Sequence, residues 1–190
     1  MKKCYMTIRK LTIAPIMAIL MLTAIMLFAP HVLQSASIFA LSLFFLGVLP
    51  TLAYPMQKYI PSYKDKGRDG QRRLAMIFAV AGYILGIAAG LIVHAPKETM
   101  VIYLVYLLSG ILIFIFNKCF HIKISGHACG IFAPICLFFY FGLYFCAAAG
   151  CVISILVYVA SLKTGRHTLP QLIGGSIVPI AVLLPIYFFM

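Results

Sequence analysis

Long apolar runs separated by short polar connections dominate the chain. They fall at about 11–29, 36–55, 74–94, 99–117, 128–146, 147–162 and 169–189. A helix needs roughly 20 apolar residues to cross the hydrocarbon core of a bilayer. No run alternates apolar and polar residues as a half-buried strand does. The pattern therefore predicts an all-α fold, a polytopic integral membrane helix bundle with six or seven transmembrane helices, of which the sixth is short.

The composition excludes a soluble domain. Hydrophobic residues make up 64% of the chain and charged residues 9%, whereas soluble proteins are about half apolar and about a quarter charged. No repeat or long linker divides the sequence, so we expect a single transmembrane domain over residues 1–190. The six cysteines are scattered in or beside the apolar runs, which makes a disulfide framework improbable.

The charges are strongly one-sided, with 15 Lys and Arg against 3 Asp and Glu. All the basic residues except Lys97 lie before the first run or in the connections after the second, fourth and sixth runs. These segments share one side of the membrane if all seven runs cross it, and the positive-inside rule makes that side cytoplasmic. The sequence thus predicts an integral protein of the cytoplasmic (inner) membrane, with a cytoplasmic N-terminus and no nucleic-acid partner. The first run is longer than a signal-peptide core, which favours a retained helix, although its cleavage stays open.

Three polar clusters lie in these basic connections, at residues 66–73, 123–127 and 163–171. Two crossings separate each cluster from the next, so all three are expected at the same membrane face. They contain Lys, Arg, Ser and two histidines but almost no carboxylate, which favours an anionic ligand such as phosphate. Ser125 and Gly126 would add backbone N–H groups at a helix N-terminus.

Two simpler interpretations remain. Basic residues at span ends are commonly topology signals or headgroup contacts, each contributing only about 1 kcal/mol. The residues Cys119, His121, His127 and Cys129 could in principle bind zinc, but their spacing fits no standard ligand pattern.

At the three clusters the chain resembles the type 2 phosphatidic acid phosphatase superfamily of membrane phosphatases, over roughly residues 58–180. That family carries K-x6-R-P, P-S-G-H and S-R-x5-H-x3-D in this order. Lys66 and Arg73 have the first spacing, residues 124–127 read I-S-G-H, and His167 with Gln171 keeps the H-x3-D spacing. Leu74 and Ile124 stand at proline positions, Gln171 stands at the carboxylate position, and Ser161 replaces the arginine.

The resemblance implies a set of roles. His167 would be the nucleophile that forms a phosphohistidine, and His127 would protonate the leaving oxygen and then activate water. Lys66, Arg73, Ser125 and Gly126 would bind the phosphate group, and Gln171 would orient the nucleophile. Lys163 or Arg166 could bind the phosphate oxygen left by the arginine missing at position 161. No metal or other cofactor is implied, because cationic side chains stabilise the transition-state charge.

We therefore expect a phosphatase-like protein that dephosphorylates a lipid-linked phosphate or pyrophosphate, with membrane lipids around it. The missing carboxylate and arginine leave a second hypothesis, a non-catalytic relative that binds or translocates an anionic phospholipid. A small channel or transporter is disfavoured, because the spans carry almost no ionisable residues at mid-membrane. The substrate headgroup and the oligomeric state are not predicted.

Overall fold

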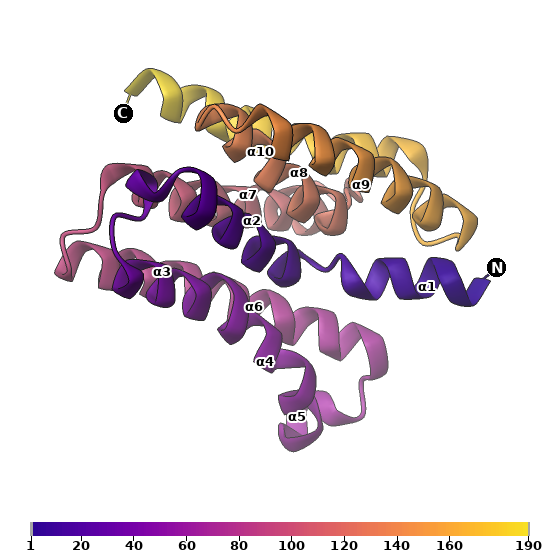
Figure 1. Ribbon diagram of the computed structural model, residues 1–190. Coiled ribbons are helices and arrows are strands. Elements are labelled where there is room, and N and C mark those ends of the chain that lie inside the picture. Colours follow the sequence, from indigo (N-terminus) through magenta and orange to yellow (C-terminus); the bar gives the residue numbers. More distant parts are fainter. Residues whose placement is uncertain (1, 190) are drawn as a thin grey trace.

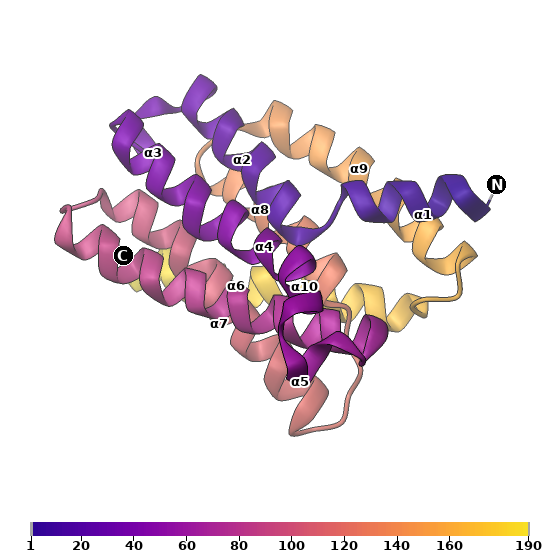
Figure 2. The ribbon, with the colours of Figure 1, turned by 90° about the horizontal axis from the view of Figure 1, so that it is seen from below.

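The computed structural model describes residues 2–189, and these residues form helices joined by short connections, with no strand among them. The long helices run roughly along one axis and the connections alternate between the two ends of the bundle (Figure 1, Figure 2). The N-terminus and the C-terminus lie at opposite ends (Figure 1). The bundle confirms the predicted all-helical class and is compatible with a membrane protein.

The helical elements correspond to all seven apolar runs. Their bounds are α1 Lys2–Leu11, α2 Ala14–Phe28, η1 Pro30–Val32, α3 Ala36–Ser42, η2 Leu43–Val48, α4 Leu49–Met56, η3 Gln57–Tyr59, α5 Pro61–Lys64, α6 Gly67–Ile92, α7 Lys97–Lys118, α8 Gly126–Tyr140, α9 Tyr144–Lys163 and α10 Leu169–Phe189. The segments from α3 to η3 form one apolar stretch, Ala36–Tyr59. It contains the π-helical turn η2, and Pro50, a residue without the N–H that a regular helix needs, lies two positions after its end.

By length and hydropathy, 5 helices among the described residues can cross a membrane, or up to 6 if the bent pair α1 and α2 is one span. The lower of the two predicted numbers, six, is compatible with this result, whereas a seventh span would need α8, which has 15 residues. At 1.5 Å per residue such a helix is about 22 Å long, short of the roughly 30 Å hydrocarbon core. The predicted boundary between the fifth and sixth runs was misplaced. The turn lies at residues 141–143, where Gly142 has a φ of 73°, and α9 begins at Tyr144.

Helix α8 lies inside the bundle and packs against α2, α7, α9 and α10. Most of its side chains are buried, and Gly130 lies so close to Ala14 at the start of α2 that a methyl group there would overlap Ala14 Cβ. Its short length and small residues therefore suit a central helix that carries its first turn, with His127, to one end of the bundle.

Glycines at every fourth position give α6 a smooth face. Gly82, Gly86 and Gly90 are buried, and a Cβ at these positions would overlap the Phe45 carbonyl oxygen, the Tyr103 ring and the Met100 sulfur respectively. Close approach of helices through small residues is the usual packing mode where lipid removes the hydrophobic drive for association.

We predict that Gly82→Ala destabilises the protein by about 1–3 kcal/mol, because the new methyl group meets a backbone oxygen that has no rotamer by which to move away. The matched control is Gly110→Ala in α7, where the nearest atom to an added Cβ is Tyr83 Cε2 at 4.0 Å. Thermal unfolding in detergent measures both. Equal stability of the two variants would contradict the tight contact at Gly82.

Candidate functional site

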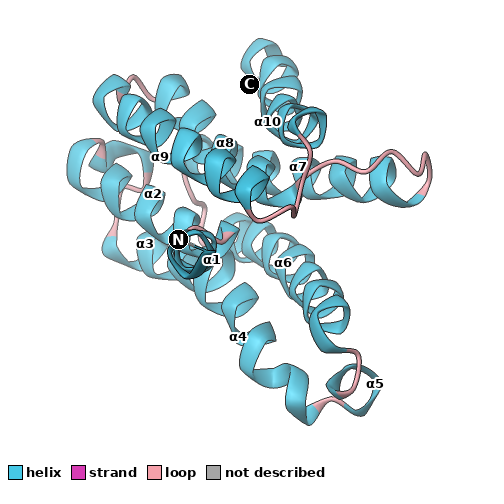
Figure 3. Cartoon of the chain, turned by 90° about the vertical axis from the view of Figure 1, so that its right-hand side faces the viewer, coloured by secondary structure: helices cyan, strands magenta, loops and turns pink. Residues whose placement is uncertain are grey.

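One end of the bundle gathers the three polar clusters. The end of α1, the start of α6, the connection before α8 and the connection between α9 and α10 all lie at this end (Figure 1). Seen from that side, α1 points along the line of sight and lies between α9 and the α4–α6 pair (Figure 3). The structure thus places at one end the segments that the sequence predicted to share a membrane face.

Gln171 joins the second cluster to the third. Its backbone carbonyl accepts a hydrogen bond from the Ser125 N–H at 2.9 Å. Its side-chain oxygen Oε1 lies 3.1 Å from His167 Nδ1 and accepts from the Thr168 N–H at 3.3 Å. The contact is close because Gly175 faces the Ser125 carbonyl, and a Cβ at 175 would overlap that oxygen.

These hydrogen bonds fix the tautomer of His167. A backbone N–H is always a donor, so the Gln171 atom that faces Thr168 is the amide oxygen. That oxygen only accepts, and therefore the hydrogen of neutral His167 lies on Nδ1. Its Nε2 carries the free lone pair, which is the state that a nucleophilic imidazole requires.

His127 lies in the first turn of α8, and its Nε2 is 3.2 Å from Thr12 Oγ1. The Thr12 hydroxyl donates to the Ile8 carbonyl at 2.8 Å. Its oxygen is therefore the acceptor for His127, which places the imidazole hydrogen on Nε2. Thr12 was not predicted as a site residue, because nothing in the sequence links the first helix to residue 127.

Both histidines are held in the neutral form. Burial lowers the pKa of His127 to about 3, and the charges of Arg9 and His167 contribute. The pKa of His167 is also lowered, mainly by burial and further by the charges of Arg9, Arg72 and Lys123, against the opposing effect of its hydrogen bond to Gln171. The two rings are thus near each other and near several cations.

The connection before α8 is held in place from both sides. Asn117 donates to the Ile124 carbonyl at 3.2 Å and accepts from the Ile124 N–H at 3.1 Å. Ser125 is fully buried and caps α8 by accepting from the Ala128 N–H at 3.2 Å. Because the Ser125 N–H is used by Gln171, the unpaired backbone donors at this helix start, among residues 2–189, are those of Gly126 and His127.

The cations nearest to the histidines differ from those the sequence singled out. The positive charge of Arg72 lowers the pKa of His167, and the charges of Arg68 and Arg72 repel that of Arg9. The Lys66 ammonium, in contrast, lies over the Tyr63 ring, 5.6 Å from its centroid. Arg68, Arg72, Arg73 and Arg166 are all exposed, and the charge of Arg166 also acts on Arg9. A spacing of four residues puts Arg68 and Arg72 on one face of α6, a signal present in the sequence but not used.

No metal site is formed among the described residues, since no three His, Cys, Asp or Glu side chains are grouped to hold an ion. Cys119, His121, His127 and Cys129 therefore do not form the zinc site considered as an alternative.

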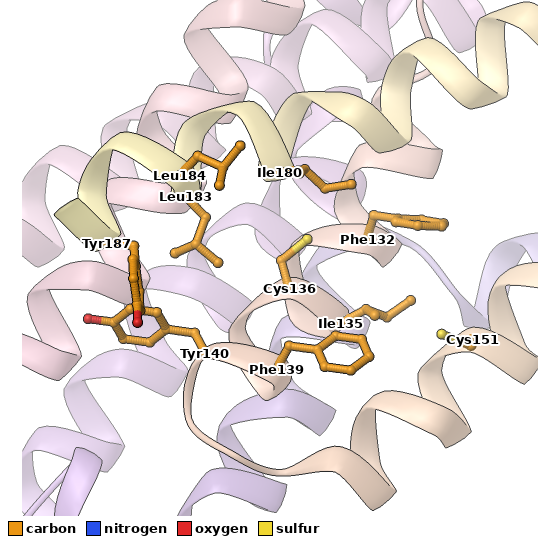
Figure 4. A pocket seen from close by; sticks show the side chains of 10 residues that line it. All are labelled: Phe132, Ile135, Cys136, Phe139, Tyr140, Cys151, Ile180, Leu183, Leu184 and Tyr187. Carbon is orange, nitrogen blue, oxygen red and sulfur yellow. The ribbon is translucent and has the colours of Figure 1, made fainter.

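Two apolar cavities lie along α10. The larger, about 440 Å³, is lined by side chains such as Phe132, Cys136, Ile180 and Tyr187 and carries no charge (Figure 4). The smaller, about 230 Å³, is lined by Ile124 and Gly174 together with residues of α7 and α10. Ile124 precedes Ser125 and Gly174 follows Gln171 by three positions, whereas His127 and His167 are not among the residues that line the smaller cavity.

Comparison of the chain with protein-family models, with curated proteins and with solved structures found no match.

We predict that acid destabilises the protein through His127. In the unfolded chain His127 becomes protonated below about pH 6.5, whereas in the folded protein it stays neutral down to a pKa of about 3. Stability is therefore complete above pH 6.5 and falls toward pH 3, by up to about 1.4 kcal/mol per pH unit. His127→Gln should weaken this dependence, as measured by thermal unfolding in detergent between pH 7 and pH 5. An identical pH dependence in the variant would show that His127 is not held neutral.

Proposed function

We propose that the chain is a membrane-embedded phosphatase of the type 2 phosphatidic acid phosphatase kind, acting on a lipid-linked phosphate or pyrophosphate. The observation that carries the proposal is the convergence of two neutral histidines with arginines from three separate segments. The charge of Arg9 acts on both histidines and that of Arg72 on His167, and Arg166 acts on Arg9. The groups that act on the histidines include no carboxylate. Such a set of donors binds an anion, and the arrangement of the imidazoles suits phosphoryl transfer.

In the first step, the His167 Nε2 lone pair attacks phosphorus, and the bond from phosphorus to the lipid oxygen breaks. His127, which is protonated beside the bound anionic phosphate, donates its Nε2 proton to that oxygen and becomes neutral; this requires the leaving oxygen to take the place of Thr12 Oγ1. In the second step, His127 accepts a proton from water, the water oxygen attacks phosphorus, and the bond to His167 breaks. The products are the lipid alcohol and inorganic phosphate.

Binding of the substrate would adjust the pKa values of the histidines to these two steps. An anionic phosphate stabilises the protonated form of a nearby imidazole and so raises its pKa. His127, neutral in the free protein, would gain acid character beside the substrate, while the cations stabilise the charge that develops on the phosphoryl oxygens.

The smaller apolar cavity supports a lipid substrate. Its lining includes Ile124, the residue before Ser125, and Gly174, three residues after Gln171. A substrate whose phosphate lies among the arginines would place its hydrocarbon chain against α7 and α10. Orientation belongs to the same proposal. The basic end of the bundle would face the cytoplasm, and the substrate headgroup would enter from that side.

A second candidate function is binding or translocation of an anionic phospholipid without turnover. Gln171 is neutral where the related phosphatases carry a carboxylate, so it orients His167 without stabilising the imidazolium. In serine proteases the corresponding loss of a carboxylate lowers turnover about 10⁴-fold. This candidate predicts salt-sensitive binding to vesicles containing phosphatidic acid and no phosphate release.

We predict that the purified protein releases inorganic phosphate from phosphatidic acid, phosphatidylglycerophosphate or a polyprenyl phosphate, and that His167→Ala abolishes the release. The matched control is His121→Asn, because His121 is an exposed histidine on the neighbouring connection and asparagine tolerates its φ of 58°. A phosphate-release assay over the lipid panel measures all three proteins. Full activity in His167→Ala would refute the phosphohistidine mechanism.

Reporter fusions after Gln57 and after Cys119 should both register on the cytoplasmic side, and a fusion after Pro96 should register outside. The expected pattern follows from the alternation of the connections and the positive-inside rule. An inverted pattern would place the site on the outer face and direct the search to lipids of that leaflet.

A further inference from the structure

Arg9 reaches the position at which the third cluster lacks an arginine. One of its terminal nitrogens, Nη1, donates a hydrogen bond to Ser161 Oγ. Ser161 is fully buried and lies six residues before His167, where the phosphatases that the chain resembles have arginine. The small serine side chain leaves space beside α9, and the guanidinium of Arg9 from α1 lies in that space.

The surroundings of Arg9 are those of an anion-binding group. It is partly buried, its side-chain hydrogen-bond partner is a neutral hydroxyl, and the charges that act on it are those of Arg166, Arg72 and Arg68. A guanidinium has five N–H donors in a rigid fork. The electrostatic repulsion among these arginines is unfavourable, and a bound anion would attract each of them and so offset the repulsion.

The bend after α1 fixes Arg9 at this place. Helices α1 and α2 meet at 54°, and Pro15 explains the break, because its ring clashes with the carbonyl of residue 11 and it lacks an N–H. Helix α1 packs along α9. The close contact between Gly130 and Ala14 holds the start of α2 against α8, and Thr12, three residues after Arg9, contacts His127. The same turn therefore contacts both histidine-bearing segments.

We propose that Arg9 binds the phosphate group of the substrate in place of the arginine missing at position 161, with Ser161 positioning the guanidinium. The inference rests on the proposed function for the identity of the ligand. It makes α1 part of the site, rather than a segment that only marks topology.

The test compares Arg9→Gln with Lys10→Gln, which removes the same charge from the exposed neighbouring residue of the same helix. Binding of inorganic phosphate to the full chain in detergent is measured by calorimetry, alongside phosphate release from phosphatidic acid. Arg9→Gln should weaken phosphate binding at least tenfold, and Lys10→Gln should change it less than twofold. In the double variant R9A/S161R, where the arginine is moved to the third cluster, binding should recover to within about threefold of the wild type.

Binding by Arg9→Gln equal to that of Lys10→Gln would overturn the inference, even if the wild type hydrolyses lipid phosphate. Loss of binding in Arg9→Gln with no turnover by the wild type would support Arg9 and refute the phosphatase. A double variant no better than R9A would assign Arg9 a purely structural role. If Arg9→Gln fails to fold, Arg9→Lys decides, with several-fold weaker binding supporting the inference and unchanged binding overturning it. A wild type that binds no phosphate would refute both proposals.

Discussion

The candidate site depends on one residue, Gln171, which binds two separate segments at once. Its backbone carbonyl accepts a hydrogen bond from the N–H of Ser125 just before α8, and its side-chain oxygen accepts one from His167 Nδ1. The Gly175 contact lets the two segments approach closely enough for this link. Without it, His127 and His167 would belong to two unconnected loops, and neither the tautomer of His167 nor its distance from the arginines would be defined.

The second constraint is electrostatic. Arginines from α1, from α6 and from the connection before α10 converge where few anionic groups are present, and the chain has only 3 acidic residues in all. Holding these charges together costs free energy that the fold must supply elsewhere. Helix α8, buried among four neighbours, and the glycine face of α6 provide close packing for that purpose. Burial is the main cause of the neutral state of the two histidines, and the surrounding positive charges add to it. Among residues 2–189 the charges that act on Arg9 are all positive, so a bound anion would stabilise this group.

Much of the architecture could be predicted from the sequence because apolar runs and basic connections are local signals. The helices, their alternation and the shared end of the three clusters followed from them. The length of α8 did not, because a turn at Gly142 inside a continuous apolar stretch has no polar marker. Contacts of Arg9 with Ser161 and of Thr12 with His127 join residues more than 100 positions apart, and hydropathy carries no information on such pairs. The choice of Arg72 over Arg73 depended on the rotation of α6 about its axis, which a K-x6-R spacing alone does not fix.

The central claim is that this end of the bundle binds a phosphate anion between two neutral imidazoles. Nitrogen-15 NMR of histidine-labelled protein in detergent, titrated with inorganic phosphate at pH 7, tests it directly. We expect His167 in the free protein to show the Nδ1–H tautomer. As phosphate is added, the signals of both His127 and His167 should shift, and those of His127 should shift toward the protonated form. The signals of His31 and His94, at the other end of the bundle, should stay unchanged. Uniform shifts of all histidines, or none at His127 and His167, would contradict the account.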